Sequence, residues 1–269
     1  MKICATCAVE YAEPLPDVCP VCADERQWVP AAGQLWTDLA EQRAAGARLV
    51  WEETEPGLVG ITVEPRVGIN QTAQLVTTPE GSLLWDPTGY LDDATVQRVL
   101  GRGPVLAVAA SHPHMFGVQV EWARALGASV LVNEADREWV GRPDPVLEYW
   151  SGRRELADGL TLLQVGGHFA GSSVAHWSAG AQGRGVLLTG DSVFPNPDRA
   201  SVGFLRSYPN KIPLSAAVVE RLASQLGALE FDRIIGNFGN RIEAGGREVL
   251  RRSADRHIGW VRGDFDHLT

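Results

Sequence analysis

Four cysteines lie within the first 22 residues of the chain, at Cys4, Cys7, Cys19 and Cys22. They form two Cys-x-x-Cys pairs. In a compartment where thiols stay reduced, such pairs indicate a tetrahedral thiolate metal site rather than disulfides. Each pair directs two sulfurs toward one ion, and the prolines between the pairs lower the cost of ordering the connection. The sequence therefore predicts one zinc or iron ion bound by the four cysteines.

The segment that carries these cysteines, CATCAVEYAEPLPDVCPVCADERQWV, resembles the rubredoxin-like module at the end of rubrerythrins and equally a zinc ribbon. The resemblance does not choose between iron and zinc, because both ions accept four thiolates. We favour a structural zinc that folds a segment too short to bury a core of its own. A redox-active iron is the alternative. We predict a four-cysteine module at residues 1–33 and a single larger domain at residues 34–269.

A second set of metal-binding residue types follows predicted strands: His112, His114, His168 and Asp191. The two neighbouring histidines come after the apolar run 105–110, and residues two apart on an extended segment project to the same side. His168 and Asp191 each follow a strand that ends in glycine. Three imidazoles and a carboxylate form a site for a first-row transition metal. We therefore expect one zinc or iron ion here as well.

The order of these residues resembles that of the metallo-β-lactamase fold superfamily. Its marker is His-x-His-x-Asp-His, followed by Gly-His, Gly-Asp and a late Gly-His-Gly, and the resemblance covers roughly residues 55–240. The segment Trp85-Asp86-Pro87-Thr88-Gly89 is similar to the superfamily's early Asp-x-Gly strand end. The resemblance implies a mixed α+β fold, a four-layer αββα sandwich with the metal at one edge of the two sheets. It also implies that the four residues above are the metal ligands.

Three positions depart from the superfamily pattern. Phe116 and Gly117 stand where the first motif has Asp and His, and the late histidine falls on Asn237 or Phe238. These side chains are not ordinary metal ligands. We therefore predict one ion at the histidine site instead of two.

The chemistry of such a site favours hydrolysis. A zinc ion on three neutral imidazoles lowers the pKa of a bound water from 15.7 toward ~7 and polarises a carbonyl. Asp191 would be a fourth ligand or a catalytic base. We expect a metal-dependent hydrolase that acts on an ester, thioester, lactone or amide of a small molecule.

Two alternatives to a hydrolase stay open. His112, His168 and Asp191 alone would form the metal-binding set of a mononuclear non-haem Fe(II) oxygenase. In that respect the chain is similar to the persulfide dioxygenases of the same superfamily. The other alternative is a non-catalytic metal-binding or ligand-binding protein whose site has decayed.

Candidate substrate contacts lie in the loop-like stretch after Asp191, at Tyr208, Asn210 and Lys211, because functional groups concentrate on loops near strand ends. Phe116 and Phe238 would form an apolar wall at the position that a second metal ion would otherwise occupy.

Short β-branched or apolar runs alternate with capped, amphipathic stretches, which predicts a mixed α/β or α+β chain. Strands are expected at 58–63, 72–78, 82–86, 105–110, 129–132, 160–165, 173–177, 185–188 and 233–235. Helices are expected at 34–45, 92–100, 118–126, 134–140, 215–226 and 247–261.

The chain has 269 residues and a formal net charge of −9, which argues against nucleic acid as a partner. It has no apolar run long enough for a membrane span and no secretory signal at its N-terminus, so we expect a cytoplasmic protein. A small-molecule substrate is the expected partner. The nine tryptophans would suit a homodimer, but the sequence leaves the oligomeric state open.

Overall fold

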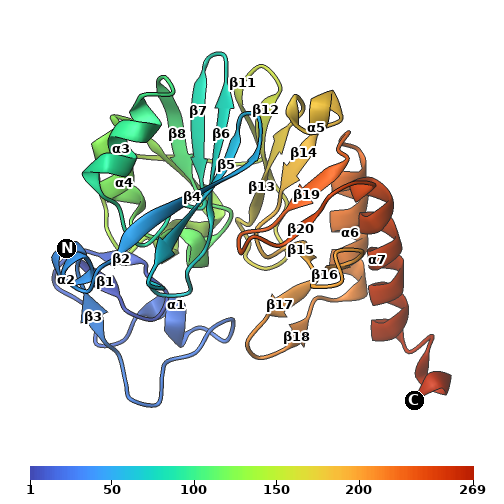
Figure 1. The fold of residues 1–269 in the computed structure, drawn as a ribbon. Helices are drawn as coiled ribbons and strands as arrows, with labels where there is room; N and C mark the ends of the chain where they lie inside the picture. The colour runs from blue at the N-terminus through green and yellow to red at the C-terminus, as the bar shows by residue number, and fades with distance from the viewer.

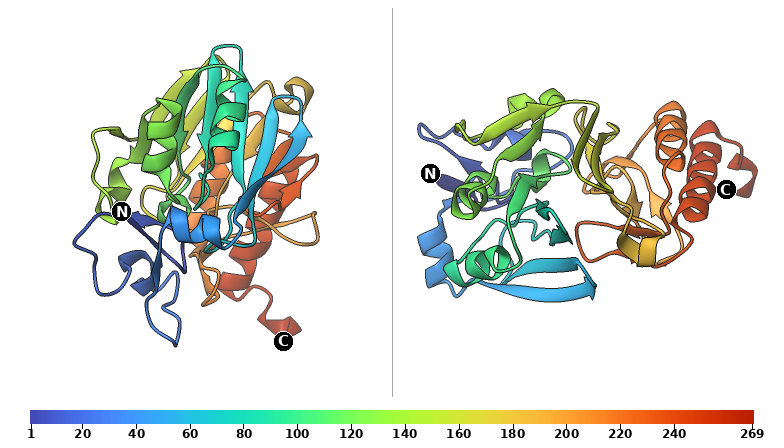
Figure 2. Two further views of the ribbon diagram at one scale, coloured as in Figure 1. Left: turned by 60° about the vertical axis from the view of Figure 1, so that its left-hand side comes forward. Right: turned by 90° about the horizontal axis from the view of Figure 1, so that it is seen from above.

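Two β-sheets face each other at the centre of the molecule, and helices cover the outer face of each sheet (Figure 1). The computed structural model describes residues 1–269. Seen from above, the layers follow one another from the N-terminal to the C-terminal side of the molecule (Figure 2). This arrangement confirms the expected αββα sandwich.

The first sheet has seven strands in the order β10-β9-β8-β7-β6-β5-β4. Strands β4 to β7 pair antiparallel, and β7 to β10 pair parallel. The strands are β4 (Arg48–Glu55), β5 (Leu58–Glu64), β6 (Ala73–Thr78), β7 (Gly81–Trp85), β8 (Val105–Ala109), β9 (Val130–Asn133) and β10 (Leu147–Trp150).

The second sheet has six strands in the order β11-β12-β13-β14-β19-β20. Its strands are antiparallel except for the pair β14 and β19. They are β11 (Arg153–Ala157), β12 (Leu160–Gln164), β13 (Ser173–Trp177), β14 (Val186–Leu188), β19 (Arg233–Ile235) and β20 (Arg241–Ile242).

Three apolar clusters hold the layers together. One consists of 17 buried residues from the facing sides of both sheets, including Trp85 and Trp177. A cluster of 25 residues lies between the first sheet, the N-terminal segment and helices α3 (Asp93–Leu100) and α4 (Gln119–Leu126). A cluster of 18 residues packs helices α6 (Ala216–Gly227) and α7 (Gly246–Arg262) on the second sheet. Burial of this apolar area is the main force that stacks the layers.

Local signals set the ends of these helices. The Asp92 side chain accepts a hydrogen bond from the Thr95 backbone at the start of α3, and Ser215 does the same for Val218 at the start of α6. Helix α4 ends at Gly127, whose φ of 66° is the left-handed conformation that glycine adopts at low cost.

The N-terminal segment forms a three-stranded sheet of β1 (Lys2–Cys4), β2 (Glu10–Tyr11) and β3 (Trp36–Thr37), with helices α1 (Pro20–Ala23) and α2 (Leu39–Ala44). The prediction of a helix from residue 34 is wrong at its start. Residues 36 and 37 pair with β1, and Asp38 then caps α2 through the Glu41 backbone. Strand pairing therefore links residues on both sides of position 33, and the division into two domains stays a prediction.

The remaining elements are short. Two ribbons, β15 (Phe194–Pro195) with β16 (Val202–Gly203) and β17 (Leu205–Ser207) with β18 (Ile212–Pro213), follow β14. The turn α5 (Gly180–Gly183) and the 3₁₀ helices η1 (Pro113–Met115), η2 (Glu134–Trp139) and η3 (Asp266–Leu268) complete the chain. None of the helices is both long and apolar enough to span a membrane.

Candidate metal centre

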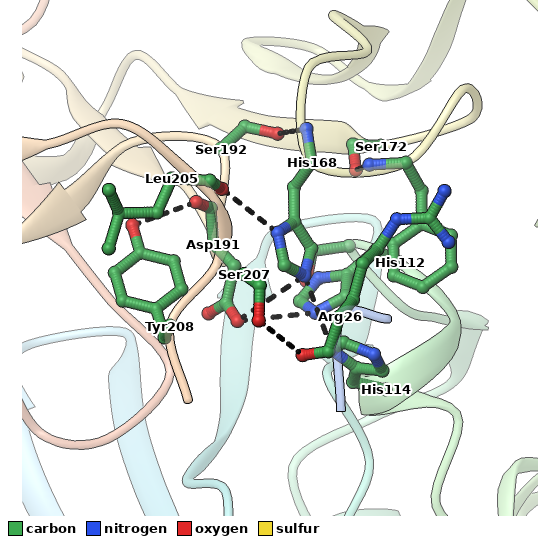
Figure 3. A network of polar contacts seen from close by, with 12 residues as sticks. Arg26, His112, His114, His168, Ser172, Asp191, Ser192, Leu205, Ser207 and Tyr208 are labelled. Atoms are coloured by element: carbon green, nitrogen blue, oxygen red, sulfur yellow. Dashed lines mark hydrogen bonds and ion pairs between the residues drawn. The ribbon is translucent and has the colours of Figure 1, made fainter. Parts of the chain in front are cut away.

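Three strands of two different sheets bring the predicted site residues together. Strand β8 leads to His112 and His114, β12 leads to His168, and β14 leads to Asp191. Because β12 and β14 are both antiparallel to β13, their carboxyl ends lie at the same edge of the second sheet. The three imidazoles and the carboxylate converge there (Figure 3). We call these four residues the His/Asp cluster.

The distances in the His/Asp cluster fit a single ion. His112 Nε2 and His168 Nε2 lie 3.6 and 3.7 Å from Asp191 Oδ2. His168 Nε2 lies 3.2 Å from His114 Nδ1, and one ligand atom from each residue lies within 4.8 Å of all the others. Ligand atoms about 2.1 Å from a tetrahedral ion are about 3.4 Å apart. The cluster is therefore the size that one ion requires.

Hydrogen bonds on the outer side of two rings leave their other nitrogens free for an ion. His168 Nδ1 lies 3.1 Å from the Leu205 carbonyl, an acceptor, so this nitrogen carries the proton. His112 Nδ1 is 2.9 Å from Ser111 Oγ, and the Ser111 backbone donates to Asp86 Oδ1 at 2.6 Å. His112 Nε2 is buried without a partner. Such outer contacts orient metal-binding histidines.

Burial lowers the pKa of two of the three imidazoles, which favours the neutral form that binds a metal. It lowers the pKa of His114 well below its usual value, and nearby His112 and His168 lower it further. Burial likewise lowers the pKa of His168 to about 3. Burial alone would raise the pKa of Asp191, but the attraction of His112 and His168 and a hydrogen bond from Asn237 leave it lowered. His114 and His168 therefore present neutral nitrogens beside a carboxylate.

Asn237, one of the two candidate positions for the late histidine, lies against Asp191. Its Nδ2 donates to Asp191 Oδ1 at 3.1 Å, and its backbone carbonyl accepts from Thr72 at 2.7 Å. An amide N–H group thus lies against the carboxylate oxygen that a second cation would need. This contact supports the prediction of one ion.

A glycine permits the close approach of the Asp191 turn to the histidine strand. Gly190 has a φ of 55°, and a Cβ atom there would lie 2.3 Å from Ser111 Oγ. A larger residue would push Asp191 away from His112.

A cavity of about 190 Å³ opens beside the His/Asp cluster. Its lining residues come from the N-terminal segment, the loop after β5, the cluster itself and the loops after β14 and β19: Arg26, Gln27, Trp28, Arg66, Ile69, His114, Met115, His168, Asp191, Phe194, Tyr208, Pro209 and Phe238. The volume suits a small molecule, since clefts for drug-sized ligands are larger.

Two of the five predicted substrate contacts lie on this cavity. Tyr208 and Phe238 line it, and the Tyr208 hydroxyl donates to the Asp191 carbonyl at 3.0 Å. Phe116 is buried in the apolar cluster around α4 and is not among the residues that line the cavity. Lys211 is exposed and does not line the cavity. Asn210 also lies outside the cavity lining, and its amide donates to the Glu25 and Gln27 carbonyls at 2.7 and 3.3 Å.

The sequence reading missed the contribution of the N-terminal segment. Arg26, Gln27 and Trp28 follow the second cysteine pair and form one wall of the cavity. The Arg26 guanidinium lies 3.8 Å from the centre of the Phe169 ring, and Ser207 Oγ donates to the Arg26 carbonyl at 3.1 Å. No spacing in the sequence signals these contacts, because they depend on how the segment docks.

The four cysteines form a second candidate metal site, which we call the four-cysteine cluster. The Sγ atoms of Cys4 and Cys22 are 3.7 Å apart, and those of Cys7 and Cys19 are 3.6 Å apart. Thiolates about 2.3 Å from a tetrahedral zinc are about 3.8 Å apart. All four cysteines are buried and free of disulfides. The geometry fits one ion.

Comparison with known proteins supports the same fold. No protein-family model matches the chain. The uncharacterized protein YmaE of Bacillus subtilis (strain 168) is 40% identical in an alignment of 269 positions that covers 98% of this chain and 98% of YmaE. A metallo-β-lactamase from Hirschia baltica is 19% identical, with a TM-score of 0.53 over 78% of this chain and 97% of that one. The protein TTHA1623, solved in a di-iron-bound form, is 25% identical, with a TM-score of 0.50 over 72% and 97%. These similarities confirm the metallo-β-lactamase fold.

Proposed function

Because this chain belongs to the same family as YmaE of Bacillus subtilis and has the metallo-β-lactamase fold, we propose that it is a metal-dependent hydrolase with one catalytic ion. The His/Asp cluster would hold that ion. The observation that carries the proposal is the convergence of three imidazoles and one carboxylate within 4.8 Å, next to a cavity.

A bound zinc or iron ion would supply a water of lowered pKa and would polarise a carbonyl oxygen. The protein's own residues do the rest. Asp191 Oδ2, 3.6 Å from His112 Nε2, is placed to complete the ligand set or to accept a proton from the attacking water. Two hydrogen bonds position Asp191. Asn237 donates to its Oδ1, and the Tyr208 hydroxyl donates to its backbone carbonyl.

The walls of the cavity favour a small carbonyl substrate. Trp28, Ile69 and Phe238 supply apolar surface that excludes water from a bound molecule. A site with one ion has no second metal ion to stabilise the leaving group. A substrate with a good leaving group therefore fits it best. We propose an ester, thioester, lactone or amide of a small molecule.

The position of His114 favours hydrolysis over iron-dependent oxygenation. Its Nδ1 lies 3.2 Å from His168 Nε2, so a third imidazole takes part in the set. Three histidines are typical of catalytic zinc, whereas two histidines and a carboxylate are typical of non-haem iron. The four-cysteine cluster would hold a structural zinc, and its reduced thiols suit a cytoplasmic protein.

Metal analysis of the purified protein tests this proposal. Wild type should contain about two ions per chain, since there are two ligand sets. The double variant His112→Ala, His168→Ala should contain about one ion and should lose hydrolysis of a panel of activated esters and thioesters. His267→Ala, in exposed η3, is the matched control and should change neither property.

Three results would contradict the proposal. The double variant could retain both ions. It could keep its hydrolytic activity after losing one. Alternatively, an iron-loaded wild type could consume oxygen with a thiol substrate while hydrolysing nothing, which would favour the oxygenase.

A further inference from the structure

The four-cysteine cluster is packed within an apolar core that it shares with the first sheet. All four cysteines belong to the same cluster of 25 buried residues as Val59 in β5, Leu84 in β7 and Trp122 in α4. A close-packed interior transmits a displacement to its neighbours, because it has little free space to absorb one. Two segments that adjoin the cysteines also line the cavity beside the His/Asp cluster.

The second cysteine pair leads directly to one wall of this cavity. Cys22 lies in α1, and the Asp24 backbone donates to the Pro20 carbonyl of that helix at 3.2 Å. The Gln27 backbone in turn donates to the Asp24 carbonyl at 3.0 Å. Gln27 and Trp28 line the cavity. The position of this wall is therefore tied to the position of α1.

The first cysteine pair supports a second wall. Ala8 follows Cys7 directly and packs closely on Gly68, so that a Cβ atom at position 68 would lie 2.6 Å from the Ala8 Cβ. Gly68 lies in the turn between Arg66 and Ile69, both of which line the cavity. A displacement of the first pair would therefore move this turn.

A metal ion at the four cysteines would join the two walls. The short distances between sulfurs run from one pair to the other, 3.7 Å from Cys4 to Cys22 and 3.6 Å from Cys7 to Cys19. The Gln34 side chain adds a bridge, since it accepts from the Cys19 backbone and donates to Cys4 Sγ. In small sites of this kind the metal supplies much of the folding free energy. Loss of the ion would therefore loosen both walls.

We propose that the ion of the four-cysteine cluster is an allosteric effector of the catalytic cavity. With the ion bound, the two walls are set for a ligand, and a ligand that touches the walls in turn stabilises the closed four-cysteine cluster. Such coupling is reciprocal, so the two effects have the same size. The inference rests on the proposed function, because the ligands that test it would be held by the ion of the His/Asp cluster.

Two hydroxamates that differ in size test the inference on the wild-type protein in a zinc-buffered solution. Acetohydroxamate chelates a metal through a small head group, whereas benzohydroxamate carries the same head group on a phenyl ring that can contact the cavity walls. Calorimetry gives the dissociation constant of each compound. Each is then used at the same multiple of its own constant, so that both stabilise the fold equally by mass action.

The rate at which dithiobis(nitrobenzoate) modifies the cysteines reports on the four-cysteine cluster alone, because the chain has no other cysteine. Benzohydroxamate should slow this modification about fivefold or more relative to acetohydroxamate, the lower end of typical allosteric coupling. Trp28→Ala should reduce the difference between the two compounds. Trp260→Ala is the matched control, because Trp260 is 45% exposed, close to the 46% of Trp28, and lies in α7 outside the cavity lining.

The reciprocal effect is measured on the double variant Cys4→Ser, Cys22→Ser. It should bind acetohydroxamate as wild type does and should bind benzohydroxamate more weakly, by the same factor as the slowing of cysteine modification. If this variant does not fold, the modification rates of wild type and Trp28→Ala decide the question without it.

The contradicting results separate the two proposals. If acetohydroxamate binds but benzohydroxamate protects the cysteines no better, or if Trp28→Ala leaves the extra protection unchanged, the coupling is wrong and the catalytic ion stands. If removal of zinc does not speed modification of the cysteines, they hold no ion and the effector is wrong, whereas acetohydroxamate binding would still support the catalytic ion. If neither hydroxamate binds, both proposals are overturned.

Discussion

The four-cysteine cluster and the His/Asp cluster both bring four buried ligand atoms to the spacing of one ion, yet they are built differently. All four cysteines come from one segment of 22 residues, and none of them lines the cavity. The His/Asp ligands come from two sheets, and three of the four border the cavity. A closed set of ligands is typical of a structural metal, and an open set is typical of a catalytic one.

The four-cysteine cluster is connected through the chain to the cavity beside the His/Asp cluster. The segment that leaves the four-cysteine cluster continues directly into Arg26 and Trp28, which line the cavity. The proposed structural metal would therefore shape the proposed active site without touching the substrate. The predictions below separate these two roles, from the largest expected effect to the smallest.

Loss of the four-cysteine cluster should have the largest effect on stability. The double variant Cys4→Ser, Cys22→Ser should lose one ion and unfold its N-terminal segment, because metal binding supplies most of the folding free energy of such small sites. Its thermal melting temperature should fall more than that of His112→Ala, His168→Ala. Equal shifts in the two double variants would remove the distinction between a structural and a catalytic site.

Arg142 joins the N-terminal segment to helix α4. Its guanidinium contacts Glu10 at 2.7 Å and Glu121 at 2.5 Å, and Glu10 also accepts from the Val120 backbone at 2.5 Å. Arg142→Met would leave the buried Glu10 without its cation, which costs about 3–5 kcal/mol. Chemical denaturation at pH 8 measures this loss. The exposed pair of Arg48 and Glu64 serves as the control, where Arg48→Gln should cost less than about 1 kcal/mol.

Stability should also depend on pH through Glu10, with an effect of at most a few kcal/mol. Burial raises the pKa of Glu10 to about 7, and its contacts with Val120 and Arg142 only partly oppose this. A carboxyl group whose pKa is higher in the folded state stabilises the protein fully below its unfolded value. That contribution is lost as the pH rises through 7.

The comparison of Glu10→Gln with wild type between pH 4.5 and pH 8 isolates this contribution. The variant should show a smaller loss of unfolding free energy with rising pH. An identical slope for both proteins would mean that Glu10 does not titrate as inferred.

The smallest expected effect is at Asn237. Asn237→Ala would remove the hydrogen bond to Asp191 Oδ1, and loss of such a supporting contact typically weakens metal binding 10- to 100-fold. Competition with a chelator measures the affinity of the His/Asp cluster, and the ion at the four-cysteine cluster should be unaffected. An unchanged affinity would mean that Asn237 does not position Asp191.

The resemblance to the metallo-β-lactamase superfamily implies the sandwich, and both ligand sets can be found in the sequence because each depends on local spacing. Strand-end histidines and paired cysteines are visible as short motifs, and helices such as α3 and α6 carry their own caps. The long edge strand β4 was not predicted, since the exposed Arg48, Glu52 and Glu53 interrupt its apolar pattern. An edge strand can carry charges where a central strand cannot.

Features that depend on how distant segments of the chain pack together could not be predicted from the spacing of residues in the sequence. Phe116 occupies the motif position of a ligand, but its side chain is buried around α4. Asn210, a predicted substrate contact, donates hydrogen bonds to the backbone carbonyls of Glu25 and Gln27. Both results depend on contacts between segments far apart in the chain, and no local pattern records such contacts.

Anomalous diffraction from crystals of the purified protein, recorded at the zinc and iron absorption edges, tests the central claim most directly. The account predicts two separate peaks per chain. One should lie among the four cysteine sulfurs, and one should lie among His112 Nε2, His114 Nδ1, His168 Nε2 and Asp191 Oδ2. Two adjacent peaks beside Asp191, or no peak among the histidines, would contradict it.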